Sequence, residues 1–239
     1  MVREFKRGFV PSDLIEFNSK QLLALQRAQR DIFYLLNNEY DLNKSVTFVS
    51  NKFSFSARQR MALIRSTASN DALMLRFSKE QKLSDLKGKT VLIDGFNLII
   101  TLEIMLLNST LLFCMDGTIR DLAGLHGTYK PIFQTDEAIK LVGAYLEKLQ
   151  VKEAVFYLDS PVSNSGILSS KIRELLSGFD FKTETVVVQN PDASLFARHN
   201  VVSSDSIVLD RCLSWVNLPY YIIQNNFSHL NLIDLSAIK

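Results

Sequence analysis

Apolar and polar positions in the first third of the chain alternate with the period of an α-helix. From Leu22 to Leu35 apolar residues recur three or four positions apart, which predicts an amphipathic helix over residues 19–38 with Asn18 as its N-cap. Asn43 is expected to cap a shorter second helix. The apolar residues that this second helix would bury are Val46 and Val49.

A third helix is predicted to begin after Ser56, because Ser56 and Gln59 have the spacing of a capping box. Its buried face is expected to contain Ala57, Met61 and Ile64. Only a few residues separate it from the second helix, so this front part has the proportions of a helix-turn-helix unit. The basic side chains that would contact nucleic-acid phosphates from the third helix are Arg58, Arg60 and Arg65. The alternative is a module that serves only for packing or for dimerisation. A dimerisation module would make the protein a homodimer.

After residue 89 the pattern changes to short β-branched runs that alternate with helical segments. These runs predict strands at residues 90–94, 110–114, 154–158, 183–189, 200–203 and 219–223. Helices are expected at residues 97–107, 135–149 (capped by Thr135), 166–177 and 206–214, with a short helix opened by Asn190 and Pro191. This alternation predicts an α/β fold, with a mainly parallel sheet covered by helices on both faces.

The two patterns together predict two domains. Residues 70–89 are polar and rich in lysine, which is typical of a linker. We therefore expect a small all-helical, helix-turn-helix-like domain at residues 1–85 and an α/β domain at residues 86–239.

Three of the predicted strands end on an aspartate: Asp94, Asp159 and Asp205. Because parallel strands place their carboxyl ends at one edge of a sheet, the three carboxylates could meet in one cleft. Hard oxygen ligands suit Mg²⁺ or Mn²⁺, so the pattern predicts a metal site that hydrolyses phosphodiesters. Taken singly, each aspartate has an alternative interpretation as a helix or turn cap.

Charge is distributed unevenly along the chain. Residues 1–89 hold seven more basic than acidic side chains, whereas residues 90–239 hold five more acidic than basic ones. A basic front part joined to an acidic back part is typical of a polyanion-binding region attached to a metal-binding domain. Two ordinary surfaces of opposite sign are the alternative.

Other features bear on the compartment. Cys114 and Cys212 stand in apolar surroundings without metal-binding spacing, so both are expected to be buried thiols in a reducing compartment. The charged first residues do not have the pattern of a signal peptide. Residues 97–114 are almost uniformly apolar, but Glu103 and Asn108 divide them into pieces too short to span a bilayer. We expect a buried helix followed by a core strand, no membrane partner and a cytoplasmic protein.

Several other polar residues are weaker candidates. The segment FCMDGTIRDL at residues 113–122 has the spacing of the phosphatase motif of haloacid-dehalogenase enzymes, but Cys114 stands in the place of their nucleophilic aspartate. The residues of this segment that could still contact a metal or phosphate are Asp116, Arg120 and Asp121, with a turn and a surface ion pair as the alternative. Additional candidates for the metal site are Glu137, Ser160 and Ser206.

Two motifs resemble those of PIN and NYN domain ribonucleases. IDGFNL at residues 93–98 is similar to their first-strand motif, and VVSSDSIVLD at residues 201–210 is similar to their late Ser/Asn-Asp motif. This resemblance implies that acidic residues bind divalent ions that activate water for RNA cleavage. It matches Asp94, Asn97 and Asp205 directly, and it supports Asp159 only through its place at a strand end.

The chain departs from the nuclease pattern in two places. The closely spaced acidic pair late in the domain is represented by Asp205 and Asp210, and the acid on the helix is Asp136, Glu137 or neither. The whole chain also resembles an uncharacterised, mainly archaeal family of unknown function. This resemblance supports the two-part layout and gives no information about activity. The expected function is a metal-dependent ribonuclease that uses Mg²⁺ or Mn²⁺ and acts on RNA rather than DNA. The alternative is a non-catalytic RNA- or nucleotide-binding protein with a degenerate acidic cleft.

Overall fold

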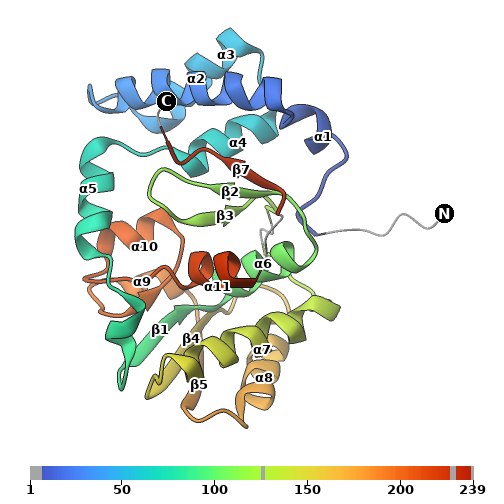
Figure 1. Ribbon diagram of the computed structural model, residues 1–239, viewed down its shortest axis with the longest axis vertical. Coiled ribbons are helices and arrows are strands. Elements are labelled where there is room, and N and C mark those ends of the chain that lie inside the picture. The colour runs from blue at the N-terminus through green and yellow to red at the C-terminus, as the bar shows by residue number, and fades with distance from the viewer. Residues whose placement is uncertain (1–6, 125–126, 227–229, 238–239) are drawn as a thin grey trace, which may run out of the picture. The chain divides into compact units, whose positions relative to one another are not determined.

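A computed structural model describes residues 7–124, 127–226 and 230–237, and the chain divides into two compact units (Figure 1). Unit 1 comprises residues 1–78, 108–123 and 229–239, and unit 2 comprises residues 79–107 and 124–228. The chain therefore passes between the units more than once, whereas the sequence pattern predicts a single boundary between residues 85 and 86.

The front of unit 1 is helical, as predicted. Its helices are α1 (Asp13–Glu16), α2 (Ser19–Leu36), α3 (Leu42–Phe53), α4 (Ala57–Ser66) and α5 (Asn70–Lys79). The Asn18 side chain accepts a hydrogen bond from the Gln21 N–H at 3.0 Å, which confirms the predicted cap of α2. Asn43 was the wrong cap for α3, because the Asp41 carboxylate accepts from the Lys44 N–H at 2.9 Å and starts the helix earlier.

The buried face of α4 differs from the predicted one. Its capping box between Ser56 and Gln59 is present, but Ala57 and Met61 are exposed and Ile64 is only partly buried. The residues buried instead are Gln59, Ala62, Leu63 and Ser66. Gln59 is turned inward because its amide donates to the Glu16 carbonyl at 2.8 Å, and this polar contact rotates the helix away from the face that hydrophobicity alone indicated.

Unit 1 is not all-helical, because later segments of the chain add a three-stranded sheet to it. The strands are β2 (Leu111–Phe113), β3 (Ile119–Asp121) and β7 (Leu232–Asp234), in the order β3-β2-β7. β2 pairs with β3 antiparallel and with β7 parallel. Helices and sheet share one core, which includes Leu25, Ile32, Val49, Leu63, Leu112 and Ile233. The strand expected at 110–114 therefore forms, but in this small sheet and not in the large parallel one.

Residues 70–89 contain structure where a polar linker was expected, namely α5 and a 3₁₀ helix, η1 (Leu83–Leu86). The reason is tertiary. The Arg76 guanidinium of α5 donates to the Asp116 carboxylate at 2.7 Å, with both side chains buried. Composition marks this segment as polar, but part of its charge lies inside unit 1.

Unit 2 is an α/β unit with a parallel sheet flanked by helices, which confirms the predicted fold class at this level (Figure 1). Its strands are β1 (Thr90–Asp94), β4 (Glu153–Asp159), β5 (Lys182–Val188) and β6 (Val201–Val202), in the order β5-β4-β1-β6, and every neighbouring pair is parallel. The helices are α6 (Gly95–Leu106), α7 (Phe133–Lys148), α8 (Ser165–Leu176), α9 (Pro191–Leu195), α10 (Ser206–Arg211) and α11 (Leu218–Asn226).

Three local predictions in unit 2 need comment. The strand expected at residues 219–223 is wrong: α11 occupies it, since Leu218, Ile222 and Ile223 are buried at helical spacing. Thr135 lies within the first turn of α7 and not at its cap. The apolar stretch 97–114 is a helix and then a strand, as predicted, and no helix in the described parts of the chain is long and apolar enough to cross a membrane.

The arginines of α4 are held by unit 1 itself. Arg58 pairs with the buried carboxylate of Asp13 and donates to the carbonyl oxygens of Gly8 and Leu122 at 2.8 and 2.9 Å. Arg65 donates to the Asp121 carbonyl at 2.6 Å, and Arg60 donates to the Phe55 carbonyl at 3.0 Å. Arg58 in particular lies largely inside the unit, so its geometry is that of a structural ion pair.

We predict that Arg58→Ala destabilises the protein. The variant would leave Asp13 buried without its cation, which costs about 3–5 kcal/mol of unfolding free energy. Urea denaturation measures this loss. The matched control is Arg30→Ala, on the exposed face of α2, which should change the unfolding free energy by less than about 0.5 kcal/mol. Equal stability of wild type and Arg58→Ala would contradict the structural assignment.

We also predict that Gly95→Ala destabilises unit 2. A Cβ atom at residue 95 would lie 2.6 Å from Leu158 Cδ2 and 3.0 Å from the Tyr157 carbonyl oxygen, so the Leu158 side chain and the start of α6 would have to shift relative to β4. The expected loss of unfolding free energy is about 1–3 kcal/mol. Gly166→Ala is the control: residue 166 lies in α8 with open space around its Cβ position, so alanine should stabilise the helix by up to about 1 kcal/mol.

Candidate functional site

The aspartates that end predicted strands lie at one edge of the parallel sheet. Asp94 and Asp159 are the last residues of β1 and β4, which are neighbours. In the pairing register Asp94 lies opposite Tyr157, so Asp159 extends two residues further along its strand. Asp205 follows the short strand β6, on the other side of β1, and begins α10. Strand order and direction thus bring the three predicted acids to the carboxyl edge of the sheet.

Asp94 is a buried carboxylate whose main partner is a side chain. Its Oδ2 accepts a hydrogen bond from the Ser203 hydroxyl at 2.8 Å, and the residue is buried. Although Asp94 precedes α6, its side chain makes no capping hydrogen bond to that helix. The alternative interpretation of Asp94 as a helix cap is therefore not supported by the geometry.

Asn97 is tied to the second motif in the same way. Its Oδ1 accepts hydrogen bonds from the backbone N–H and the hydroxyl of Ser204, both at 2.9 Å. Ser203 in turn accepts the Asp205 backbone N–H at 3.0 Å through its hydroxyl. The Asp-Gly-x-Asn and Ser-Ser-Asp motifs, more than 100 residues apart in the chain, form one hydrogen-bonded assembly.

Asp205 does serve as a helix cap. Its Oδ1 accepts from the Ile207 N–H at 2.8 Å and from the Val208 N–H at 3.3 Å. The capping role and a place at the acidic edge are compatible, because a carboxylate has several lone-pair sites. Ser206, predicted as an additional candidate, is the first residue of the helix that Asp205 caps.

Sequence reasoning missed a fourth acid at this edge, Asp192. It lies in the first turn of α9, directly after β5, where the Asn190 side chain caps the helix by accepting from the Ala193 N–H. A signal was present, because β5 is a fourth apolar run followed by a turn and an aspartate. Gln189, Asn190 and Pro191 stand between the strand and the acid, so Asp192 does not show the pattern of a strand that ends on aspartate, by which the other three candidates were predicted.

Burial and mutual repulsion disfavour ionisation of this cluster. Burial, together with the charges of Asp192, Asp205 and Asp159, raises the pKa of Asp94 to about 7, against the opposing effect of the Ser203 hydrogen bond. Burial and the charges of Asp205 and Asp159 raise the pKa of Asp192 to about 6. Burial also raises the pKa of Asp159.

The chemistry of these donors suits a hard cation. The four aspartates (Asp94, Asp159, Asp192 and Asp205) form no salt bridge with lysine or arginine in the described residues. Oxygen ligands without a protein cation are what Mg²⁺ and Mn²⁺ prefer. Within the same residues, no three acidic, histidine or cysteine side chains lie close enough together to ligate one ion directly. A cation held here would keep part of its water shell.

The remaining candidates of unit 2 are near or outside this edge. Ser160 follows Asp159, its backbone N–H donates to the Val188 carbonyl at 2.7 Å, and its buried hydroxyl has no hydrogen-bond partner in the structure. Glu137 is exposed on α7, and its neighbour Asp136 pairs with Lys171 at 2.7 Å. Neither residue of α7 is among the causes of the raised pKa values of Asp94, Asp159 and Asp192.

The candidates from residues 113–122 belong to unit 1 and are held in structural contacts there. Asp116 is buried between Arg76 and Arg120 and also accepts from the Thr118 hydroxyl at 2.6 Å. Asp121 accepts from the Ala123 N–H at 2.7 Å and lies 3.6 Å from Arg65. Asp116, Arg120 and Asp121, the weaker candidates for metal or phosphate contacts, thus take part in ion pairs and hydrogen bonds within unit 1.

We predict that the stability gain from Asp94→Asn depends on pH. The pKa of Asp94 is about 7 when folded and near its ordinary value of 3.8 when unfolded, so wild type loses stability as pH rises from about 4 to about 7. Asparagine keeps an acceptor for Ser203 but no charge. The variant should gain up to about 4 kcal/mol relative to wild type between pH 4 and pH 8, measured by urea denaturation across that range.

The control for this pH series is Asp180→Asn, an exposed acid just before β5, whose effect should be small at every pH. A constant stability difference between Asp94→Asn and wild type across the series would show that the charge of Asp94 is not destabilising.

Comparison with known proteins places the chain in a family without an assigned activity. Residues 83–221 match the family described as a domain of unknown function (DUF5616), and residues 24–79 match a family described as a protein of unknown function (DUF434). An uncharacterised protein of Methanocaldococcus jannaschii is 37% identical over 187 residues, which cover 78% of this chain and 89% of that protein. No solved structure matches the chain significantly.

The first of these matches spans the strands and helices that carry all four aspartates. The matched families and the relative have no assigned function, and nothing in their descriptions points to a PIN or NYN domain. Because the match at residues 83–221 covers more than half of the chain, this protein belongs to the DUF5616 domain family.

Proposed function

We propose that this protein is a metal-dependent ribonuclease whose active site is the acidic edge of the parallel sheet. The observation that carries the proposal is the buried carboxylate of Asp94, which other acids surround and no basic side chain neutralises in the described residues. Burial of such a group costs stability, and clustered groups with strongly perturbed pKa values occur preferentially at functional sites. The similarity of the two motifs to PIN and NYN nucleases supports the same reaction class.

Asp94, Asp159, Asp192 and Asp205 would hold Mg²⁺ or Mn²⁺, partly through water. When bound, the ion lowers the pKa of a coordinated water and neutralises charge on the transferring phosphoryl group. Ser203 orients Asp94 through its hydroxyl, and the same hydroxyl accepts the N–H of Asp205, so one serine sets the position of two acids.

Asn97 would position the substrate. Its Oδ1 is occupied by Ser204, whereas its Nδ2 donates to no other residue in the described parts of the chain. An amide N–H beside an acidic cluster is a suitable donor to a non-bridging phosphate oxygen. Asn97 is half-buried, so the amide is fixed on one side and accessible on the other.

The second candidate function is a non-catalytic RNA- or nucleotide-binding protein that uses the same edge. One observation favours it: within the described residues no three potential ligands are close enough to hold one ion directly. A degenerate site would keep the hydrogen bonds between the Asp-Gly-x-Asn and Ser-Ser-Asp motifs but would no longer cleave RNA.

The first test of the proposal is cleavage of a labelled single-stranded RNA by wild type in Mg²⁺ or Mn²⁺. We expect divalent-dependent cleavage that falls by roughly 100-fold or more in Asp94→Asn, because the variant removes one anionic ligand. Asp180→Asn is the matched control and should cleave as wild type does. The non-catalytic alternative predicts RNA binding without cleavage in all three proteins.

A second test uses thermal unfolding and does not depend on the substrate. Mn²⁺ should raise the melting temperature of wild type, and by more at pH 8 than at pH 6, because Asp94 must lose its proton to bind the ion. Asp94→Asn should show a smaller shift with little dependence on pH. Absence of any divalent-ion stabilisation together with absence of cleavage would overturn the nuclease proposal.

A further inference from the structure

The outward faces of α2 and α3 carry large aromatic side chains that unit 1 does not bury. Tyr34 of α2 is 68% exposed and Phe48 of α3 is 74% exposed. α3 crosses α2, and the C-terminal end of α3 lies on the side of α2 that faces away from the three-stranded sheet of the same unit (Figure 1). These two rings do not contribute to the core of unit 1, so we consider a partner that binds them from outside.

A groove lies between these two rings. It has a volume of about 550 Å³ and is lined by Asp31, Tyr34 and Leu35 from α2 and by Phe48, Val49, Asn51 and Lys52 from α3. Val49 and Leu35 form the apolar floor, since Val49 is buried and Leu35 is partly buried. The groove therefore has an apolar base between two exposed aromatic rings, and a planar group can stack on such rings.

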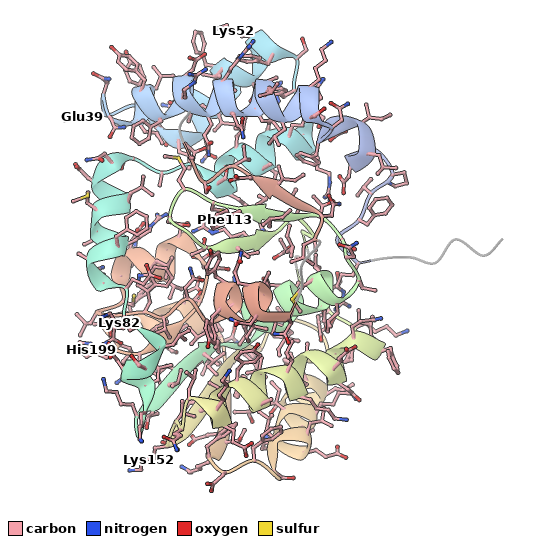
Figure 2. The ribbon with its side chains drawn as sticks, in the orientation of Figure 1. Glu39, Lys52, Lys82, Phe113, Lys152 and His199 are labelled. Atoms are coloured by element: carbon pink, nitrogen blue, oxygen red, sulfur yellow. The ribbon has the colours of Figure 1, made fainter. Side chains whose placement is uncertain are left out.

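Exposed basic side chains lie on the two helices that form the groove. Arg30 and Arg27 lie on the exposed face of α2, one turn and two turns before Tyr34, and Lys44 lies one turn before Phe48. In the described residues these three side chains form no ion pair or hydrogen bond. Lys52 lies on the outer side of α3 (Figure 2) and pairs with Asp31 at 3.3 Å, but both remain exposed to solvent.

The exposed basic side chains indicate which kind of partner this surface binds. In a symmetric pair of copies, Arg27, Arg30 and Lys44 of one chain would approach the same basic face of the other, and the like charges would repel. A polyanion is complementary to this face. Exposed aromatic rings set among phosphate-binding cations are the composition by which proteins bind single-stranded nucleic acids.

We infer that this surface, defined as Arg27, Arg30, Tyr34, Lys44, Phe48 and Lys52, binds single-stranded RNA. Bases stack on Tyr34 and Phe48, and phosphates contact the basic side chains. The inference deepens the proposed ribonuclease function and rests on it for the choice of RNA over DNA. It replaces Arg58, Arg60 and Arg65 as the expected contacts, because those arginines bond to unit 1 itself.

The test measures binding of the full-length protein to a fluorescein-labelled 20-nucleotide oligouridine by fluorescence anisotropy in EDTA, where divalent-dependent cleavage is absent. Tyr34→Ala and Phe48→Ala should each weaken binding by roughly 5- to 100-fold. Both side chains are largely exposed, so the variants should keep the melting temperature of wild type. Phe133→Ala, which removes another exposed ring (86% exposed) in unit 2, is the matched control and should bind as wild type does.

Two further arms separate stacking from charge. Arg27→Ala combined with Arg30→Ala should flatten the dependence of log affinity on log salt by about 1.4, since each phosphate contact to a single strand contributes about 0.7. A duplex RNA of the same length should bind more weakly than oligouridine, because its bases are already stacked. Equal affinity for both RNAs, or unchanged binding by Tyr34→Ala and Phe48→Ala, would overturn the inference.

Its failure can be told apart from failure of the nuclease proposal. Cleavage that depends on Asp94, with binding that does not depend on Tyr34 or Phe48, would leave the active site standing and remove this surface. RNA binding that depends on Tyr34 and Phe48, without RNA cleavage, would support this surface and remove the nuclease proposal. Dimers in sedimentation analysis that Tyr34→Ala and Phe48→Ala dissociate would assign the surface to self-association and overturn the RNA inference.

Discussion

The hydrogen bond from Ser203 to the buried carboxylate of Asp94 is the interaction on which the candidate site depends. Ser203 follows β6 and Asp94 ends β1, so the bond joins the carboxyl ends of two adjacent parallel strands. The same hydroxyl receives the Asp205 N–H, and Ser204 bonds Asn97 alongside it. Gly95 contributes by having no Cβ, which lets the chain turn from β1 into α6 against the β4 residues Tyr157 and Leu158.

A site of this kind is held at an energetic cost. Desolvation and three neighbouring acids raise the pKa of Asp94 to about 7. Near neutral pH the carboxyl group of Asp94 is therefore only partly ionised in the metal-free protein, whereas the same group in water would be fully ionised. Such a group resembles the perturbed acids of active sites more than it resembles a cap, because Asp94 bonds no N–H of α6 with its side chain. A divalent cation would relieve the repulsion among the four aspartates, which links metal binding to stability and to proton release.

In unit 1, by contrast, the buried acidic side chains are paired with arginines. Arg58 with Asp13, and Arg76 and Arg120 with Asp116, are buried pairs in which each charge has its partner. The pair of Arg76 with Asp116 connects α5 to the segment at residues 108–123, whereas the pair of Arg58 with Asp13 joins α4 to α1. The basic excess of the front region is thus divided, with part of it neutralised inside the unit and part of it, at Arg27, Arg30 and Lys44, presented to solvent beside exposed rings.

Local patterns in the sequence determined a large part of this description. Helical periodicity located α2, the Ser56 and Gln59 spacing predicted the capping box of α4, and strand runs ending on aspartate located Asp94 and Asp159 at the sheet edge. These features depend on residues a few positions apart, so spacing alone reports them. Only the tertiary structure decided that β2 joins a separate sheet with β7, that residues 218–226 are helical, that Asp192 joins the acidic edge and that Arg58 turns inward. Each of those outcomes depends on side chains that meet across tens of residues or more, where burial and pairing of charge outweigh local propensity.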